Sequence, residues 1–494
     1  METRSGSDGP EIRFGTDGWR GIIAKDFTFE NVGRVAQALA DFLRSPQRRE
    51  LELYREWGVE CRPPDRGVVI GYDTRFWSRE FAVFFGRVLR SNDIPVWLSA
   101  EPVPTPALSW AVVHRRAACG VMITSSHNPF YYNGVKLKPE FGGSAPPQVT
   151  QMVEGFLRDE FELKAEEEDL EVVDLREPYL ERLRELVDLE LLEGAPLRVV
   201  VDAMYGSARG YLPAILEELG IDYVAIRSGS DPYFGGKDPE PIPRNLVPLK
   251  AVIASQRGGL RRGELLVGVV TDGDGDRVAA MDEQGEFIDP HRIYTLLFRH
   301  LVRRGGRGLA VKTFSLTDMA SKFARKHGIE LVETPIGFKY IGELMLQREV
   351  LIGGEESGGI GVKGHLPERD GLLNSLLLLE VVAQEGVPPS EIIVGLMEEL
   401  GQHHYDRRDL QLERRLEVVA RLKEQPPKRF AGREVVAVET LDGIKLRFED
   451  GWLLLRASGT EPKLRLYCEM DRPEKVREVL DEAERYVRGE LGLW

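Results

Sequence analysis

The chain has 494 residues, of which 42% are hydrophobic and 30% are charged, and its formal net charge is −15. This length suggests about three or four domains, and the composition is that of a globular protein, not a disordered one. Proteins that bind nucleic acids or anionic membranes usually carry basic surfaces, so the acidic balance excludes both as expected partners.

Cysteine usage and the start of the chain predict a cytoplasmic protein. Cys61, Cys119 and Cys468 are far apart and form no CxxC pair, so we expect neither a disulfide framework nor a zinc site. Residues 1–10 are polar and lack the apolar core of a signal peptide. The longest apolar stretch, residues 372–383, contains three polar residues and is too short to span a bilayer.

Helices and strands alternate along the first part of the chain, which is typical of an open α/β sheet. Apolar side chains recur at helical spacing in residues 28–43, and Thr28 is the expected N-cap. The charged, proline-containing residues 45–66 predict a surface insertion. The elements expected next are a strand at 68–71, a helix at 78–90, a strand at 96–98, a helix at 106–115 and a strand at 119–123.

The same alternation begins again twice, so we infer three α/β units of similar plan. The second unit has strands at 197–202 and 265–270 and a helix at 208–219. The third has strands at 309–313, 330–333 and 350–352 and a helix at 318–327. A smaller α+β unit follows, with strands at 434–439, 444–448, 452–456 and 464–469, a helix at 472–490 and a charged connector at 407–429.

Three polar clusters each follow directly after an apolar strand. They are residues 124–129 (TSSHNP), 272–277 (DGDGDR) and 355–359 (EESGG). In open α/β sheets, ligands bind just beyond the carboxyl ends of the strands. We therefore expect the three units to point these loops into one shared cleft.

The cluster at 272–277 predicts a magnesium site. Side chains at alternate positions project to one side, so Asp272, Asp274 and Asp276 can converge while the glycines between them let the backbone curl around a small cation. Three carboxylates with open positions for substrate oxygens suit Mg²⁺. An EF-hand calcium loop would use Glu283 as its last ligand, but Arg277 stands where that loop needs glycine. A solvated acidic turn is a third interpretation, which repulsion between the carboxylates disfavours.

The other polar clusters are ambiguous from their residues alone. Ser126 is a nucleophile candidate, but TSSHNP is equally consistent with a turn, and His127 need not be the base for its neighbour. Lys136 follows closely and could place an ammonium beside this loop. The EESGG cluster offers carboxylates and a hydroxyl to sugar hydroxyls, or is a polar turn. Residues 456–462 (RASGTEP) could form a phosphate nest.

Taken together, these motifs resemble those of the α-D-phosphohexomutase family, which includes phosphoglucomutases and phosphomannomutases. The resemblance extends from residues 14–21 (FGTDGWRG) to residues 465–467, with the four motifs in family order and at family spacing. It implies an α/β fold of three similar domains with mixed sheets and a smaller C-terminal α+β domain around a central cleft. The expected domains are residues 1–176, 177–288, 289–405 and 406–494.

The resemblance also implies a role for each matching residue. Ser126 would carry the phosphoryl group and bind Mg²⁺ together with Asp272, Asp274 and Asp276. The residues expected around the reacting phosphate are Arg20, Lys136 and Arg277, with Lys136 preferred over His127 and His365 for proton handling. The residues expected to bind the sugar are Lys339, Glu355, Ser357 and His365, and those expected to hold the second phosphate are Arg456, Ser458, Gly459 and Thr460.

The expected reaction interconverts hexose 1-phosphate and hexose 6-phosphate through phosphoserine and a hexose 1,6-bisphosphate, which is also the expected activator. The Glu-Glu-Ser form of the sugar loop resembles glucose-type members, whereas glucosamine-type members commonly have Gln in place of Glu356. A phosphomannomutase or a dual-specificity enzyme is an alternative, and a non-catalytic sugar-phosphate binding protein is a more distant one. The expected partner is a small phosphosugar, and the chain is expected to be a monomer or a homodimer.

Overall fold

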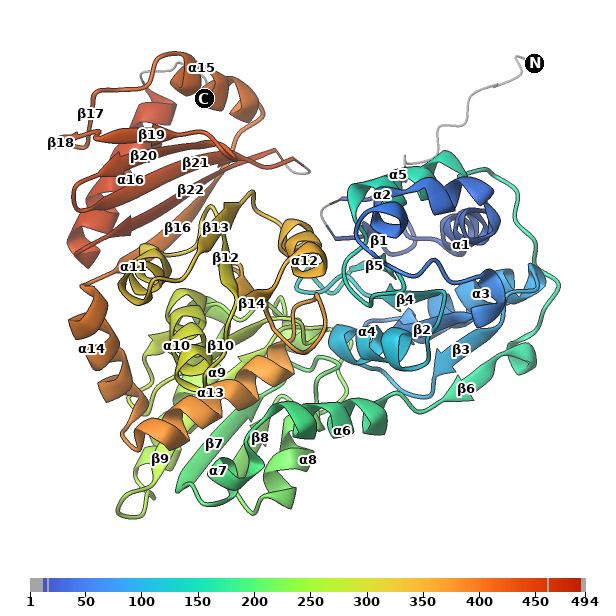
Figure 1. Cartoon of the computed structure of the whole chain (residues 1–494), viewed down its shortest axis with the longest axis horizontal. Coiled ribbons are helices and arrows are strands. Elements are labelled where there is room, and N and C mark those ends of the chain that lie inside the picture. Colours follow the sequence, from blue (N-terminus) through green and yellow to red (C-terminus); the bar gives the residue numbers. More distant parts are fainter. Residues whose placement is uncertain (1–11, 16, 460–461, 490–494) are drawn as a thin grey trace.

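The computed structural model describes residues 12–15, 17–459 and 462–489, which form four units, each built on its own sheet (Figure 1). The first sheet has the order β1-β5-β4-β2-β3-β6, in which β4, β2, β3 and β6 are parallel and β5 runs antiparallel to both of its neighbours, β4 and β1. Its strands are β1 (Trp19–Ile22), β2 (Val68–Tyr72), β3 (Val96–Ser99), β4 (Cys119–Ile123), β5 (Tyr132–Lys138) and β6 (Glu171–Val173). The helices of this unit are α1 (Phe29–Arg44), α2 (Glu52–Arg55), α3 (Ser78–Ser91), α4 (Thr105–His114) and α5 (Pro147–Gly155). Thr28 caps α1 as predicted, because its hydroxyl accepts a hydrogen bond from the backbone N–H of Asn31.

The second sheet has the order β11-β10-β9-β7-β8 and is also mixed. Its strands are β7 (Leu197–Asp202), β8 (Asp222–Ile226), β9 (Leu265–Thr271), β10 (Val278–Met281) and β11 (Phe287–Ile288). The helices along this part of the chain are α6 (Arg176–Leu186), α7 (Leu189–Glu193), α8 (Tyr211–Glu218) and α9 (Val247–Arg257).

The third sheet has the order β13-β12-β14-β15, with β15 antiparallel to its neighbour. Its strands are β12 (Leu309–Thr313), β13 (Leu331–Thr334), β14 (Val350–Gly354) and β15 (Ile360–Val362). The helices along this part of the chain are α10 (Pro290–Arg303), α11 (Asp318–His327), α12 (Phe338–Gln347), α13 (Gly371–Glu385) and α14 (Pro389–Leu400).

Helix α13 joins the second and third units. It packs against β9 and β10 of the second sheet and against α10 of the third unit (Figure 1). Every residue from 371 to 382 is buried, which explains why the sequence there is almost continuously apolar. None of the helices in the described part of the chain is long and apolar enough to cross a membrane.

The three mixed sheets share one local plan, which confirms the predicted similarity of the three α/β units. In each, a buried parallel strand ends in one of the polar clusters, and the chain then returns as an antiparallel neighbour. The three strand pairs are β4 with β5, β9 with β10, and β14 with β15. Each polar loop therefore lies at the carboxyl end of a parallel strand, where ligands bind in such sheets.

The fourth unit is an antiparallel sheet with the order β16-β22-β21-β20-β19, which completes the predicted fold class. Its strands are β16 (His404–Gln411), β19 (Ala437–Glu439), β20 (Ile444–Phe448), β21 (Gly451–Ala457) and β22 (Lys463–Met470). It also contains the short pair β17 (Arg429–Phe430) and β18 (Arg433–Glu434) and the helices α15 (Arg415–Glu424) and α16 (Pro473–Arg488).

Four sequence-based expectations differ from the structure. The stretch 407–429 is not merely a connector, because β16 pairs with β22 over its whole length and α15 packs on the sheet. The predicted domain boundary after residue 405 cuts through β16, and the single strand expected at 434–439 is divided between β18 and β19. The insertion at 45–66 is not confined to the surface, because the guanidinium of Arg48 is buried and pairs with the carboxylate of Glu140.

Candidate active site

Ser126 lies in the loop that joins β4 to β5, in a backbone conformation that few residues adopt. Its φ angle is 52°, its side chain is buried, and its backbone N–H donates to the hydroxyl of Thr124. The loop is held by the buried guanidinium of Arg75, which donates to the carbonyl oxygens of Ser126 (2.6 Å) and Asn128 (2.7 Å). Left-handed φ values of this kind persist only when surrounding contacts impose them.

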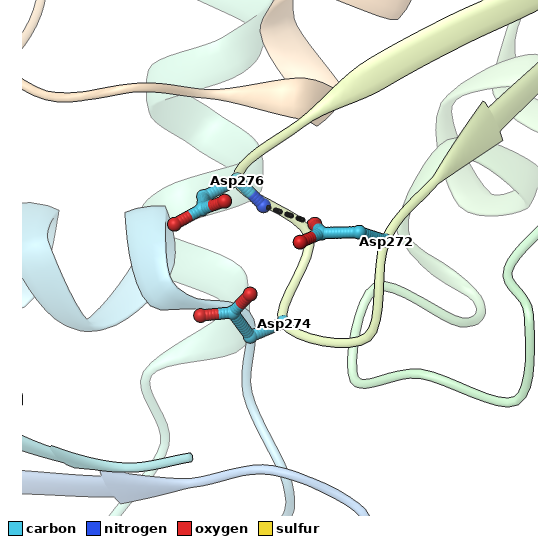
Figure 2. A group of neighbouring side chains, drawn as sticks. All are labelled: Asp272, Asp274 and Asp276. Carbon is cyan, nitrogen blue, oxygen red and sulfur yellow. Dashed lines mark hydrogen bonds between the residues drawn. The ribbon is translucent and has the colours of Figure 1, made fainter. Parts of the chain in front are cut away.

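The hydroxyl of Ser126 is joined to the aspartate loop. Ser126 Oγ donates to Asp272 Oδ2 at 2.9 Å, and Asp272 Oδ1 accepts from the backbone N–H of Asp276 at 3.1 Å. Figure 2 shows the carboxylates of Asp272, Asp274 and Asp276 converging from one tight turn. One oxygen from each lies within 4.8 Å of the others, and all three side chains are fully buried.

These carboxylates fit a magnesium ion. Oδ1 of Asp274 and Oδ1 of Asp276 are buried without a hydrogen-bond partner in the described part of the chain. Burial and the neighbouring carboxylates of Asp276 and Asp274 raise the pKa of Asp272. A divalent cation would satisfy the unpartnered oxygens and remove this repulsion, and oxygen ligands are those that Mg²⁺ prefers. The residues that would hold it are Ser126 and the three aspartates.

The calcium alternative is not supported, because the carboxylate of Glu283 lies elsewhere. Its oxygens accept hydrogen bonds from the hydroxyl and the backbone N–H of Ser390, at the start of α14. Among the described residues, the aspartates at 272, 274 and 276 form the one grouping of potential metal ligands.

The glycines of the aspartate loop allow it to touch the serine loop. A Cβ atom added to Gly273 would lie 2.6 Å from the carbonyl oxygen of Ser126, closer than any side chain tolerates. Gly275 has a φ angle of 72°, and a Cβ atom there would meet Pro104 at 2.9 Å. Both positions therefore need glycine for the first two units to meet.

Lys136 acts as a counter-charge in this arrangement. Its buried ammonium forms ion pairs with Asp17 (2.8 Å), Asp274 (2.8 Å) and Asp276 (3.0 Å). Burial opposes the charged amine, but these three carboxylates outweigh it and raise the pKa of Lys136. An amine held protonated in this way is a poor proton acceptor, so the structure does not support the preference for Lys136 as the proton-handling residue.

His127 lies next to the hydroxyl of Ser126, and two arginines contact the serine loop and the aspartate loop around it. His127 Nδ1 lies 3.4 Å from Ser126 Oγ, and burial together with Arg277 and Arg20 lowers the pKa of His127 well below its usual value. Its imidazole is therefore neutral near pH 7. Arg20 donates to the Asn128 side chain of the serine loop, and Arg277 Nε lies 3.8 Å from Asp272.

The sugar loop after β14 lies beside this group. Glu355 Oε2 is 3.5 Å from Arg369 Nη1, and burial raises the pKa of Glu355 to about 7 even though Arg369 opposes that shift. Ser357 is half-buried in the same loop. Lys339 lies in the first turn of α12, and burial lowers the pKa of its half-buried amine.

Arg369 belongs to the candidate site although its role was not predicted from the sequence. Its buried guanidinium pairs with Asp17 of the first unit, Asp276 of the second (2.8 Å) and Glu355 of the third (3.5 Å). One cation thus ties together three units that lie far apart in sequence. The available signal was its place two residues before α13, in the same motif as His365.

The structure does not bring His365 into this group. Its imidazole is buried, with Nε2 2.9 Å from Asp370 Oδ2, and its ring lies near that of Trp110. Asp370 in turn caps α13 and accepts hydrogen bonds from the hydroxyl of Tyr179. The sugar-binding role expected of His365 is therefore not supported, because the side chain is part of a structural network between units.

The predicted phosphate loop lies at the end of β21. Arg456 Nε donates to Asp442 Oδ2 at 2.9 Å, and the carbonyl oxygen of Ser458 accepts from Arg415, a residue the sequence analysis did not single out. Gly459 is exposed, whereas Thr460 lies outside the described residues. Arg465 lies on neighbouring β22, and its charge also helps to lower the pKa of His127.

Comparison with known proteins agrees with this geometry. Four family models match successive parts of the chain, described as phosphoglucomutase/phosphomannomutase alpha/beta/alpha domains I (residues 11–164), II (177–285) and III (289–400) and the C-terminal domain (413–485). A phosphoglucomutase/phosphomannomutase of Thermococcus kodakarensis is 31% identical over 95% of this chain and 96% of its own. A phosphoglucosamine mutase of Carboxydothermus hydrogenoformans is 29% identical over 95% of this chain and 97% of its own.

A solved structure of a phosphomannomutase-type protein from Thermus thermophilus superposes with a TM-score of 0.83 at 39% sequence identity, covering 97% of this chain and all of that one. The same four domains in the same order are thus found over nearly the whole length of the chain. The chain belongs to the phosphoglucomutase/phosphomannomutase family and is a phosphohexomutase.

Proposed function

We propose that this enzyme interconverts glucose 1-phosphate and glucose 6-phosphate in the cytoplasm, with Ser126 as the carrier of the phosphoryl group. The observation that carries the proposal is the contact of Ser126 Oγ with Asp272, beside two aspartate oxygens that lack partners. A hydroxyl, a cation site and several arginines within one buried cluster are what phosphoryl transfer requires.

Each residue then has a defined task. Phosphorylated Ser126 gives its phosphoryl group to the free hydroxyl of the hexose monophosphate, and the sugar becomes the 1,6-bisphosphate. The bisphosphate then turns over in the site, and the phosphoryl group that the substrate originally carried is transferred to Ser126. Arg20, Arg277 and Lys136 place positive charge around the transferring group, while Arg456 and Ser458 hold the phosphate that does not react. Glu355 and Ser357 orient the sugar hydroxyls. When bound, Mg²⁺ supplies further charge neutralisation to the phosphoryl oxygens.

His127 is a better candidate than Lys136 for accepting a proton, because its imidazole is neutral. Its ring nitrogen Nδ1 also lies close enough, at 3.4 Å from Ser126 Oγ. Positioning and electrostatics remain the main contributions, since phosphoryl transfer needs little covalent chemistry from the protein.

A second candidate substrate is glucosamine phosphate. The relative from Carboxydothermus hydrogenoformans is named a phosphoglucosamine mutase. Glu356, whose presence argued against this sugar, uses its carboxylate to accept a hydrogen bond from Ser315 (2.5 Å) within the third unit. Because this carboxylate already binds Ser315, the presence of Glu at position 356 is weaker evidence about which sugar the enzyme binds than the motif alone suggests.

A coupled assay decides between these substrates. Glucose 1-phosphate, mannose 1-phosphate and glucosamine 1-phosphate are compared at equal concentration, with Mg²⁺ and with or without the matching 1,6-bisphosphate. The proposal expects the largest kcat/KM for glucose 1-phosphate and a requirement for the bisphosphate. A larger value for glucosamine or mannose phosphate would reassign the substrate, and no turnover of any of them would support a binding protein instead.

A further inference from the structure

Asp442 lies at the contact between the third and fourth units. It occupies the turn between β19 and β20, and its Oδ2 accepts two hydrogen bonds, each of 2.9 Å. One comes from the backbone N–H of Ile336, in the segment that leads into α12 and Lys339. The other comes from Nε of Arg456, which leads into the phosphate loop. A single carboxylate oxygen thus joins the sugar side of the cleft to its phosphate side.

The surroundings make this bridge stronger than a surface ion pair. The side chains of Asp442 and Arg456 are 22% and 17% exposed. Ile336 packs beside an apolar cluster formed across the same contact by Phe314 of the third unit with side chains of the fourth, namely Trp452, Leu454 and Tyr467. Charge-assisted hydrogen bonds gain strength where water is partly excluded.

The turn that carries Asp442 is itself held in place. Gly443 has a φ angle of 94°, and a Cβ atom there would lie 2.4 Å from the carbonyl oxygen of Leu455, directly before Arg456. The turn and the phosphate strand are therefore in close backbone contact, so a shift of Asp442 and a shift of Arg456 are coupled.

We propose that Asp442 is a positioning residue that couples docking of the fourth domain on the third to the orientation of Arg456. The inference rests on the proposed function, in which Arg456 holds the phosphate that does not react. A guanidinium is planar, so a hydrogen bond to Nε sets the plane of its two terminal amino groups. When the domains dock, the N–H of Ile336 fixes the carboxylate, and the carboxylate fixes the guanidinium. Phosphate binding and domain docking then favour one another.

The bridge is tested first without any ligand. Hydrogen exchange, followed by mass spectrometry on peptides that contain Ile336, is compared between the parent Ser126→Ala protein and its Asp442→Ala derivative. Loss of the acceptor should speed exchange of the Ile336 amide by about tenfold or more, since a hydrogen bond and the docking contact that protects it are both weakened. The Arg456→Ala variant keeps the Asp442 carboxylate as the acceptor, so the Ile336 amide should exchange more slowly in it than in the Asp442→Ala variant. Equal exchange in the parent and in Asp442→Ala would overturn the bridge.

The coupling to Arg456 is tested by calorimetric titration of glucose 1-phosphate into the same Ser126→Ala background, which prevents turnover. Asp442→Ala and Arg456→Ala should each weaken binding by about tenfold or more, because a charge-assisted contact to phosphate is misdirected or lost. The double variant should bind no more weakly than Arg456→Ala alone, because Asp442 acts through that side chain. Losses that multiply in the double variant would overturn the proposal.

Asp450→Ala is the matched control. This carboxylate also belongs to the fourth unit, but it pairs with Lys475 (2.6 Å) and Arg433 (3.5 Å), away from the third unit. It should leave the Kd for glucose 1-phosphate unchanged even if it lowers the melting temperature, which separates positioning from general destabilisation. Failure of the proposed function would give a different result, because the Ser126→Ala parent would then bind no glucose 1-phosphate. Hydrogen exchange at Ile336 would still test the bridge in that case.

Discussion

The guanidinium of Arg75 donates a hydrogen bond of 2.6 Å to the carbonyl oxygen of Ser126, the residue that carries the proposed phosphoryl group. The same guanidinium also holds the carbonyl oxygens of Asn128 and Pro129 and pairs with Asp73 at 3.0 Å. The left-handed backbone of Ser126 is therefore imposed by a side chain that comes from the end of the neighbouring strand β2. A loop held in this way keeps its hydroxyl aimed at the aspartates before any ligand arrives.

Replacing Arg75 should damage both the fold and the reaction. Arg75→Ala leaves the buried carboxylate of Asp73 without the guanidinium that neutralises its charge, which should lower the free energy of unfolding by about 3 kcal/mol. Release of the serine loop should lower kcat on the order of 100-fold, measured in the coupled assay at a temperature where the variant remains folded. The control is Arg79→Ala, whose exposed ion pair with Glu167 should contribute little. Full activity in a folded Arg75→Ala protein would show that the loop holds its shape unaided.

Substitution of Ser126 or of its neighbour Ser125 distinguishes a catalytic role from a structural one. Ser126→Ala should abolish turnover and the incorporation of labelled phosphate from glucose 1,6-bisphosphate, because its oxygen is the covalent carrier. Its melting temperature should change by only about 2 °C, since one hydrogen bond to Asp272 is lost. Ser125→Ala is the matched control, because Ser125 Oγ is buried without a partner in the described part of the chain. If label were found in the Ser126→Ala protein, another residue would be the carrier.

The metal site can be tested independently of turnover. Asp274→Asn replaces one charged ligand by a neutral amide and should weaken Mg²⁺ binding by about tenfold or more in a calorimetric titration, with a parallel fall in rate. Glu283→Gln serves as the control, because that carboxylate binds the start of α14 and should leave the affinity for Mg²⁺ unchanged. The reverse pattern, with affinity lost in Glu283→Gln and kept in Asp274→Asn, would restore the calcium-loop interpretation.

Glu355 should make stability depend on pH. Burial raises the pKa of its carboxyl to about 7 in the folded protein, above the ordinary value of 4.5 for the unfolded chain. The folded state therefore binds this proton more tightly, and the stabilisation is fully present below pH 4.5 and is lost as the pH rises through about 7. The loss should amount to no more than about 3 kcal/mol.

The measurement compares melting temperatures of the wild type and Glu355→Gln from about pH 5 to about pH 8, a window that spans the raised pKa. The neutral variant should become relatively more stable as the pH rises, because its side chain never has to ionise in a buried site. Glu349→Gln is the control, since that side chain is 81% exposed and should give a constant difference. A constant difference for Glu355→Gln as well would mean that its carboxyl titrates normally.

Much of the fold follows from local patterns. The parallel strands β4, β7, β9 and β12 are fully or mostly buried, so they appear in the sequence as continuous apolar runs with polar clusters at their ends. The short antiparallel strands β10, β11 and β15 were not predicted. Strands of two to four residues are too short to show a recognisable pattern of apolar and polar residues. They form because they pair with the unpaired edge of a neighbouring strand.

Some residues of the candidate site could be predicted from the sequence and others only from the structure. The three aspartates were predicted as a metal site from residue types at fixed spacing within one short loop, whereas Ser126 was singled out only through the resemblance to the family. The contacts of Arg369 could not be predicted, since it reaches Asp17 across 352 positions of chain and its partners come from three different units. His365 shows the converse, because its motif matched the family while its side chain turns toward Asp370.

The sequence by itself thus determined the α/β architecture and the aspartate cluster, since each depends on neighbours within a few residues, and the motifs taken together pointed to Ser126 through their resemblance to a family. Only the tertiary structure decided which charges compensate one another: Lys136 is held protonated by three carboxylates, Arg75 imposes the serine loop, and Asp442 joins Ile336 to Arg456. The physical reason is that buried charges must find partners wherever the fold places them, and separation along the chain carries no information about that distance.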